Sequence, residues 1–236
     1  MITFESWRAF YQSELQAVWS LLPVPAAFLA HQLLSRRARE AGAGSSQARF
    51  LRAWAVLFAA GTLLDPLVGG KLMSVLGAPP LVGTAVMLAF VLLGDFRVYW
   101  LVLALALRDA RRGARLAAAA TPVVPLLAYA SDRLAERLAP DPTGQRLWLI
   151  HELLFTGVAI WLGTRWLPGR ALDPMTLRFL RRVCGYVTLY YGLWASCDAL
   201  WFATSWDWLW LLRAVPNQLY YAFFVPFVWI AYSRRG

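Results

Sequence analysis

The chain has 236 residues, of which 60% are hydrophobic and 15% are charged, and its formal net charge is +10. Soluble domains are typically about 45–50% apolar and about 25% charged, so this composition excludes an ordinary soluble domain and indicates a polytopic membrane protein. The charge does not indicate nucleic-acid binding, because the basic residues form short clusters between apolar runs and no zinc spacing or basic helix accompanies them.

The first residues predict a short helix on the membrane surface. Residues 1–13 lack the positive region and the small-residue cleavage site of a signal peptide. One side of a helix over this segment is apolar, since it carries Phe4, Trp7, Phe10 and Tyr11. We therefore expect an amphipathic helix that lies in the outer interface.

Seven apolar segments follow, and each is close to the length of about 20 residues that a bilayer core requires. Pro122 and Pro125 predict that the fourth segment is kinked or continues into residues 131–138. The sequence thus predicts an all-α protein in which residues 1–236 form a single seven-helix transmembrane domain. The seven expected spans are residues 14–34, 53–76, 81–107, 115–130, 147–164, 183–204 and 209–232.

The basic residues between these segments predict the orientation. Sixteen of them fall on one side and six on the other, with Arg97 inside a span. Because the side that is rich in basic residues is normally cytoplasmic, we expect the N-terminus outside and the C-terminus inside. All basic residues except Lys71 are arginine, which is typical of a GC-rich genome. The expected location is a bacterial inner membrane.

Two pairs of short motifs suggest an internal repeat. The third span contains DFRVYW and the seventh PNQLYY, while the second contains LLDPL and the sixth SCDAL. These pairs favour a 3+1+3 arrangement of two three-helix units, as in small transporters with parallel repeats. Chance similarity between apolar helices is the equal alternative.

Polar side chains at similar depths in several spans are the main candidates for a functional site. A charged group at the bilayer centre costs at least about 2.5–3.5 kcal/mol, so it is rarely placed there without a role. We expect one internal cavity that binds substrate or protons, lined by Asp65, Asp95, Arg97, Tyr99, Asp198, Asn217 and Gln218. His151 and Glu152 are candidates for a proton relay, although an interfacial pair fits them equally well.

The charge balance of these spans is the most informative feature. Four carboxylates, Asp65, Asp95, Glu152 and Asp198, accompany one certain cation, Arg97. A carboxylate in a medium of low dielectric constant takes up a proton unless a cation or water compensates its charge. Excess acid therefore suits proton coupling or a cationic ligand. An ion pair between Arg97 and Asp65 or Asp198 could equally be a structural contact between helices.

Prolines beside two of the polar residues predict local breaks in the helices. Pro216 precedes Asn217 in the seventh span, and Pro66 follows Asp65 in the second. Proline removes a backbone donor, and broken helices at membrane depth often form substrate or ion sites. A simple kink that neighbouring helices tolerate is the alternative.

These features favour a small proton- or cation-coupled transporter that binds a small molecule or cation. A sensor or accessory subunit of a membrane complex is the second candidate, and a lipid-active enzyme is the third. No motif indicates a catalytic group, a metal ligand set or a cofactor, so enzymatic activity is the less favoured class. The expected partners are the lipid bilayer and a ligand but not nucleic acid, and a homo-oligomer or membrane-protein partner stays open.

Overall fold

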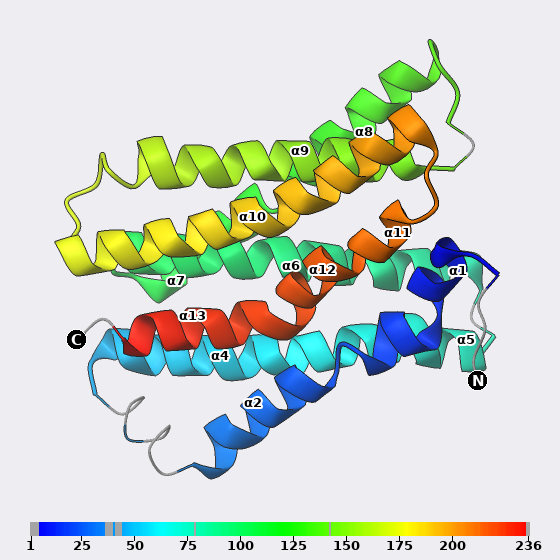
Figure 1. Cartoon of the computed structure of the whole chain (residues 1–236). Coiled ribbons are helices and arrows are strands. Elements are labelled where there is room, and N and C mark those ends of the chain that lie inside the picture. The colour runs from blue at the N-terminus through cyan, green and yellow to red at the C-terminus, as the bar shows by residue number, and fades with distance from the viewer. Residues whose placement is uncertain (1–4, 36–39, 41–43, 78, 142, 235–236) are drawn as a thin grey trace. The chain divides into compact units, whose positions relative to one another are not determined.

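The computed structural model describes residues 5–35, 40, 44–77, 79–141 and 143–234. The structure is 83% helical, with no strand in these ranges, which confirms the all-α class (Figure 1). The start of the predicted interfacial helix and most of the link after the first span lie outside the described residues. Among the described residues, five helical segments are long and apolar enough to cross a membrane, and they are Leu15–Leu34, Ser46–Gly69, Leu81–Leu107, Ala110–Glu136 and Gln145–Trp166.

These five segments overlap the first five predicted spans, although the second begins and ends seven residues earlier than predicted. The fourth is interrupted by a turn at Thr121 and Pro122 and then continues to Glu136, as its prolines predicted. The last two predicted spans are also helical, but polar residues such as Asp198 and Asn217 make them less apolar than the first five. They comprise α10 (Pro174–Thr204), α11 (Leu209–Leu212), α12 (Ala214–Asn217), η4 (Gln218–Phe223) and α13 (Phe224–Ser233).

The chain divides into two compact units, each built from two stretches of sequence. Unit 1 contains Met1–Tyr11 and Ala118–Pro216, with most of α1 (Trp7–Gln12), α8 (Val123–Glu136), α9 (Gln145–Trp161), η3 (Leu162–Trp166), α10 and α11. Unit 2 contains Gln12–Ala117 and Asn217–Gly236, with η1 (Leu15–Trp19), α2 (Pro23–Leu34), α4 (Ser46–Asp65), η2 (Pro66–Leu72), α5 (Met73–Val75), α6 (Pro80–Leu107), most of α7 (Ala110–Ala120), η4 and α13.

Capping residues set several helix ends. The Ser45 side chain accepts a hydrogen bond from the Ala48 N–H and begins α4, and Asp173 does the same for α10 through the Thr176 N–H. Asp109 accepts the backbone N–H groups of Arg112 and Arg111 at the start of α7. The Arg112 hydrogen bond in particular holds the pKa of Asp109 below its ordinary value, because it stabilises the ionised carboxylate.

Wide π-helical turns follow both of the prolines expected to disturb their helices. The regular α4 ends at Asp65, and η2 begins at Pro66. In the last helical run, η4 begins two residues after Pro216. A proline cannot donate the backbone hydrogen bond that a regular helix needs, and π-helical turns are frequent at functional sites. The predicted local breaks are confirmed at both positions.

Unit 2 is organised around α4, which packs against α2, α6 and α13 (Figure 1). The fully buried Trp54 of α4 donates its indole N–H to the Arg97 carbonyl of α6 at 3.1 Å. Its ring also packs against Phe58 and against Phe224 of α13. These contacts fix α4 between α6 and α13, on both sides of the Arg97 side chain.

Unit 1 is organised around α9, which packs against α8 and α10 (Figure 1). Near the start of α9, the Arg146 Nε donates to Asp132 of α8 at 2.8 Å, and Nη2 pairs with Glu136 at 2.5 Å. Further along, the Phe155 ring of α9 lies 4.5 Å from that of Tyr191 of α10. Polar contacts therefore hold one end of α9 and aromatic contacts hold its middle.

The N-terminal helix α1 contacts its own unit as well as presenting an apolar surface. Its Trp7 side chain is 46% exposed, as expected for an interfacial helix. However, the Trp7 N–H donates to the Asp207 carboxylate at 2.6 Å, and the Tyr11 ring lies 5.5 Å from that of Trp210. The segment after α10 thus anchors α1, which composition alone did not predict.

A close approach between α6 and α7 makes Gly113 a sensitive position. A Cβ atom there would lie 2.6 Å from both the Cα and the backbone N of Ala104. We expect Gly113→Ala to lower the free energy of unfolding by about 1–3 kcal/mol, because backbone atoms cannot yield without a helix shift. Thermal unfolding in detergent measures this. At Gly83 of α6 an added Cβ meets nothing within 4 Å, so Gly83→Ala is the matched control. Equal stability of the two variants would contradict the close contact.

Candidate functional site

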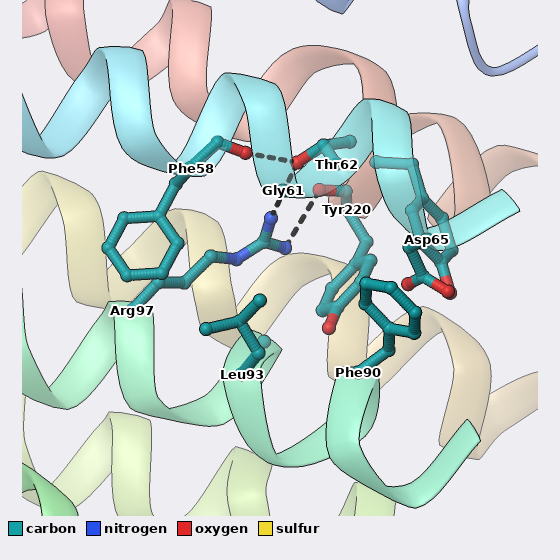
Figure 2. Close-up of a pocket in the computed structure, with 10 residues that line it drawn as sticks. Phe58, Gly61, Thr62, Asp65, Phe90, Leu93, Arg97 and Tyr220 are labelled. Atoms are coloured by element: carbon teal, nitrogen blue, oxygen red, sulfur yellow. Dashed lines mark hydrogen bonds between the residues drawn. The ribbon is translucent and has the colours of Figure 1, made fainter. Parts of the chain in front are cut away.

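A small polar cavity in unit 2 contains two of the sequence-predicted charged residues. Its volume is about 20 Å³, and its polar groups come from α4, α6 and η4 (Figure 2). A cavity needs roughly 10–15 Å³ of this kind to hold one water molecule, so this one suits a single water. We call it the Arg97 cavity, and its lining residues are Phe58, Gly61, Thr62, Asp65, Phe90, Leu93, Gly94, Arg97, Tyr220 and Tyr221.

The Arg97 guanidinium crosses one end of this cavity and is held by η4, α4 and α13. Its Nη2 donates to the Tyr220 carbonyl at 2.9 Å, and Nη1 donates to the Thr62 hydroxyl at 3.4 Å (Figure 2). The guanidinium carbon lies 4.1 Å from the centre of the Tyr220 ring and 4.7 Å from that of Phe224. Cation–π contacts of this kind stabilise a desolvated arginine. Arg97 is only 3% exposed.

Asp65 occupies the other end of the cavity, with the Tyr220 ring lying between it and the guanidinium (Figure 2). Its carboxylate hydrogen-bonds the Tyr221 side chain and interacts electrostatically with Arg97. Asp65 is the last residue of α4, directly before η2, and both tyrosines belong to η4. The carboxylate therefore lies at the end of a regular helix and faces the π-helical segment η4 across the cavity.

A glycine makes room for this arrangement. A Cβ atom at Gly94 of α6 would collide with the Tyr220 hydroxyl and come within 2.8 Å of the ring carbon that carries it. The tyrosine ring can lie across α6 only because this side chain is absent. The charged residues of the LLGDFR stretch thus follow a glycine that admits the ring on which Arg97 packs.

Asp95 and Tyr99 share a face of α6, as their four-residue spacing predicted, but neither lines the Arg97 cavity. Asp95 is fully buried and Tyr99 is 7% exposed. The two groups are close enough for the aspartate charge to act on the tyrosine hydroxyl. Asp95 is therefore a buried charge of unit 2 that the cavity itself does not use.

The two amide residues after Pro216 are also absent from the cavity lining. Asn217 is 8% exposed. The Gln218 Nε2 donates to the Ser20 hydroxyl at 2.9 Å and to the Ser20 carbonyl at 3.3 Å. Gln218 therefore ties the start of η4 to the residue that follows η1, and its predicted contact with a ligand stays a prediction.

A second group of polar residues lies within unit 1, and we call it the Arg213 cluster: Gln145, Glu152, Asp198 and Arg213. The Arg213 Nη1 forms an ion pair with Asp198 Oδ1, and its Nη2 lies 3.5 Å from Glu152 Oε1. The Gln145 Nε2 donates to the other Asp198 oxygen at 2.5 Å. Exposure of the two acids is 4% for Glu152 and 1% for Asp198, so the cluster is almost completely buried.

His151 lies beside this cluster in sequence but packs mainly among aromatic rings. Its imidazole is 5.9 Å from the Tyr191 ring and 6.1 Å from the Phe155 ring. The side chain is 5% exposed and is therefore buried within unit 1. A proton relay through His151 stays a prediction.

Arg213 is the residue that sequence reasoning missed. It was counted with the outer loop because it lies near the start of the seventh predicted span, yet it is 9% exposed and pairs with two carboxylates. The signal was its position in the apolar run LWLLRAV. With Arg213 included, the charged residues inside the predicted spans are four acids and two arginines. The predicted outer side of the membrane then has five basic residues instead of six.

Comparison with protein-family models, curated proteins and solved structures gives no match. The interpretation of both polar groups therefore depends on the chemistry of the chain's own residues.

The Arg213 cluster predicts a strong effect of removing its cation. We expect Arg213→Met to lower the free energy of unfolding by about 3–5 kcal/mol, because it leaves two buried carboxylates without their counter-ion. Adding Asp198→Asn should restore part of the loss. Arg133→Met, which removes an exposed arginine beside Tyr129, should change stability by less than about 0.5 kcal/mol. Chemical unfolding in mixed micelles measures all three. An Arg213→Met variant with unchanged stability would contradict the buried ion pairs of Arg213 with Asp198 and Glu152.

Proposed function

We propose that this protein is a small integral membrane transporter coupled to protons, with Asp65 as the coupling carboxyl group. The observation that carries the proposal is the Arg97 cavity, which holds a carboxylate at one end and a guanidinium at the other, with η4 beside both. A half-buried carboxylate near a single arginine can bind a proton without a large rearrangement of charge. The cavity has room for one water molecule, which can deliver the proton to Asp65 or remove it.

The size and charge of the cavity favour a proton over a larger ligand. About 20 Å³ accommodates one water but no organic molecule. The Arg97 guanidinium is permanently charged and repels a metal cation in a low-dielectric site. A proton neutralises Asp65 and adds no bulk. Of the two coupling ions that excess acid allows, the proton therefore fits this cavity better.

Coupling follows from what protonation does to the contacts of Asp65. The ionised carboxylate attracts Arg97 and accepts a hydrogen bond from Tyr221. Once protonated, it loses the electrostatic attraction, while Arg97 keeps its contacts with Tyr220 and Phe224. The attraction between Asp65 at the end of α4 and Arg97 of α6 is then lost. Because η2 begins directly after Asp65, and π-helical turns are frequent at functional sites, this loss allows the movement of α4 and η2 that a transporter requires.

We further propose that the chain crosses the membrane seven times, with α10 and the α12–α13 run as the last two spans. α10 has 31 residues, which corresponds to about 46 Å of helix, longer than the hydrocarbon core of about 30 Å. With the basic residues on the cytoplasmic side, the N-terminus is outside and the C-terminus inside a bacterial inner membrane. The 3+1+3 repeat remains a proposal without support from the division into units, because unit 2 joins the last helices to the first three spans.

A sensor or accessory subunit is the second candidate, and a specific observation favours it. The Arg97 cavity is too small for an organic substrate, so it provides no path for a larger ligand. A subunit would need no such path and would co-purify with a fixed partner in mild detergent. A lipid-active enzyme is less favoured, because Glu152 and His151 are buried within unit 1.

Proton coupling is testable in proteoliposomes that contain a pH-sensitive dye. Addition of a transported solute from a chemical panel should produce a proton flux, because substrate and proton move together. We expect Asp65→Asn to reduce this flux to that of protein-free vesicles, while Asp141→Asn, in a loop outside the five apolar segments, keeps it. A flux that survives Asp65→Asn, or no flux with any solute, would contradict the proposal.

The seven-span topology is testable by cysteine labelling, because both native cysteines are buried. In intact cells, an impermeant maleimide should label Ser6→Cys and Ser205→Cys but should label Ala171→Cys only after lysis. Five crossings alone would place Ser205 on the same side as Ala171, so labelling of Ser205→Cys distinguishes seven from five. Protection of Ser205→Cys in cells that label Ser6→Cys would contradict the seven-span model.

A further inference from the structure

The Arg213 cluster contains more buried negative charge than positive charge. Within unit 1, one guanidinium serves two carboxylates, and both acids are at least 96% buried. Two ionised carboxylates around one arginine would leave a net charge of −1 in a medium of low dielectric constant, which is costly. The cluster therefore needs a further positive charge or one neutral acid.

The hydrogen bonds identify which acid is the weaker partner of Arg213. Asp198 has both oxygens engaged, one by Arg213 Nη1 and the other by Gln145 Nε2. Glu152 contacts Arg213 through Oε1 at 3.5 Å, while its buried Oε2 has no hydrogen-bond partner among the described residues. A buried carboxylate oxygen without a donor is unfavourable when charged but tolerable when protonated. The proton thus belongs on Glu152.

The groups that face Glu152 from neighbouring elements supply no second cation in the described part of unit 1. From α10 come Asp198 and the Cys197 thiol, which interacts electrostatically with both Glu152 and Arg213. On α8, the neighbouring helix, Asp132 and Glu136 are paired with Arg146. The adjacent His151 of α9 packs against Tyr191 and Phe155. Arg213 is therefore the compensating charge that Glu152 must share.

The N-terminal helix α1 covers the arginine of this cluster. The Tyr11 ring lies 5.6 Å and the Trp210 ring 5.4 Å from the Arg213 guanidinium carbon. Asp207 holds α1 in place by accepting the N–H groups of Trp7 at 2.6 Å and Arg8 at 3.3 Å. Exchange of a proton at the cluster with solvent would therefore depend on whether α1 is docked.

We propose that Glu152 is a proton-binding site of the Arg213 cluster, protonated at neutral pH while Asp198 keeps the arginine, and covered by α1. Loss of this proton gives Glu152 a charge that competes with Asp198 for Arg213. The guanidinium then shifts from one carboxylate toward the other and changes its contacts with Tyr11 and Trp210. Proton binding at Glu152 is thereby linked to the docking of α1. The inference does not depend on Asp65 or on transport.

Infrared difference spectroscopy of the purified full-length protein tests this assignment directly. A protonated carboxyl group has a C=O stretching band distinct from that of a carboxylate and shifted in D₂O. We expect the wild-type spectrum at neutral pH to contain such a band that is lost in Glu152→Gln and retained in Asp65→Asn. Two results would overturn the proposal. One is that Glu152→Gln removes a carboxylate band instead of a carboxyl band, and the other is that the wild-type spectrum contains no carboxyl band at neutral pH.

Two further variants test whether Glu152 and Asp198 share Arg213 and whether α1 covers the cluster. Asp198→Asn leaves the whole guanidinium to Glu152, so the Glu152 carboxyl band should be lost to a carboxylate band. Its persistence in folded Asp198→Asn would overturn the charge-sharing argument. In Asp207→Asn, hydrogen–deuterium exchange of the Glu152 band should be faster than in the wild type, whereas an unchanged rate would show that α1 does not cover the site.

Discussion

A guanidinium group buried in an apolar helix bundle must have its charge and its N–H groups compensated by the protein, and this requirement organises both units. In unit 2, a backbone carbonyl, a threonine hydroxyl and two aromatic rings compensate the charge and the N–H groups of Arg97, and Asp65 lies nearby. In unit 1, two carboxylates compensate Arg213. One arginine is held largely by neutral groups, and the other by more acid than it can neutralise.

The difference between these two environments explains why each suits a different role. Arg97 stays in place whether or not Asp65 is charged, since the Tyr220 carbonyl and the two rings hold it. Asp65 can therefore change its protonation without loss of the local structure. Arg213 depends on its carboxylates, so a change of charge at Glu152 alters the balance with Asp198. In the proposals above, Asp65 acts as a proton-coupling group in unit 2, and Glu152 acts independently as a proton-binding group beside α1 in unit 1.

The sequence predicted the parts of the fold that follow from local patterns. Apolar runs of about 20 residues predicted helices at the five segments that meet the requirements for spanning, and Pro66 and Pro216 predicted the irregular turns at η2 and η4. The Asp95–Tyr99 pair followed from helical spacing. Each of these depends on residues close together in the chain, where helix geometry fixes the relation between them.

The composition of the candidate sites could not be predicted in the same way. Contacts such as Arg97 with Tyr220 or Arg213 with Glu152 join residues far apart in sequence, and they depend on helix rotation. Gly94 has no local signal for its role, because its importance is the ring that it admits. The hydrogen bond of Gln218 with Ser20 likewise depends on the rotation of η4. A single cavity for all polar residues stays a prediction, while within the units Arg97 and Arg213 each have their own set of neighbours.

The central claim is that Asp65 and Arg97 interact within the apolar interior and that a proton can end this interaction. The most direct measurement is a double-mutant cycle with Asp65→Asn and Arg97→Met, followed by unfolding in detergent at neutral and at acidic pH. We expect a coupling energy of about 0.5–3 kcal/mol at neutral pH that falls toward zero when Asp65 is protonated. A coupling energy near zero at both pH values, with all variants folded, would contradict the account.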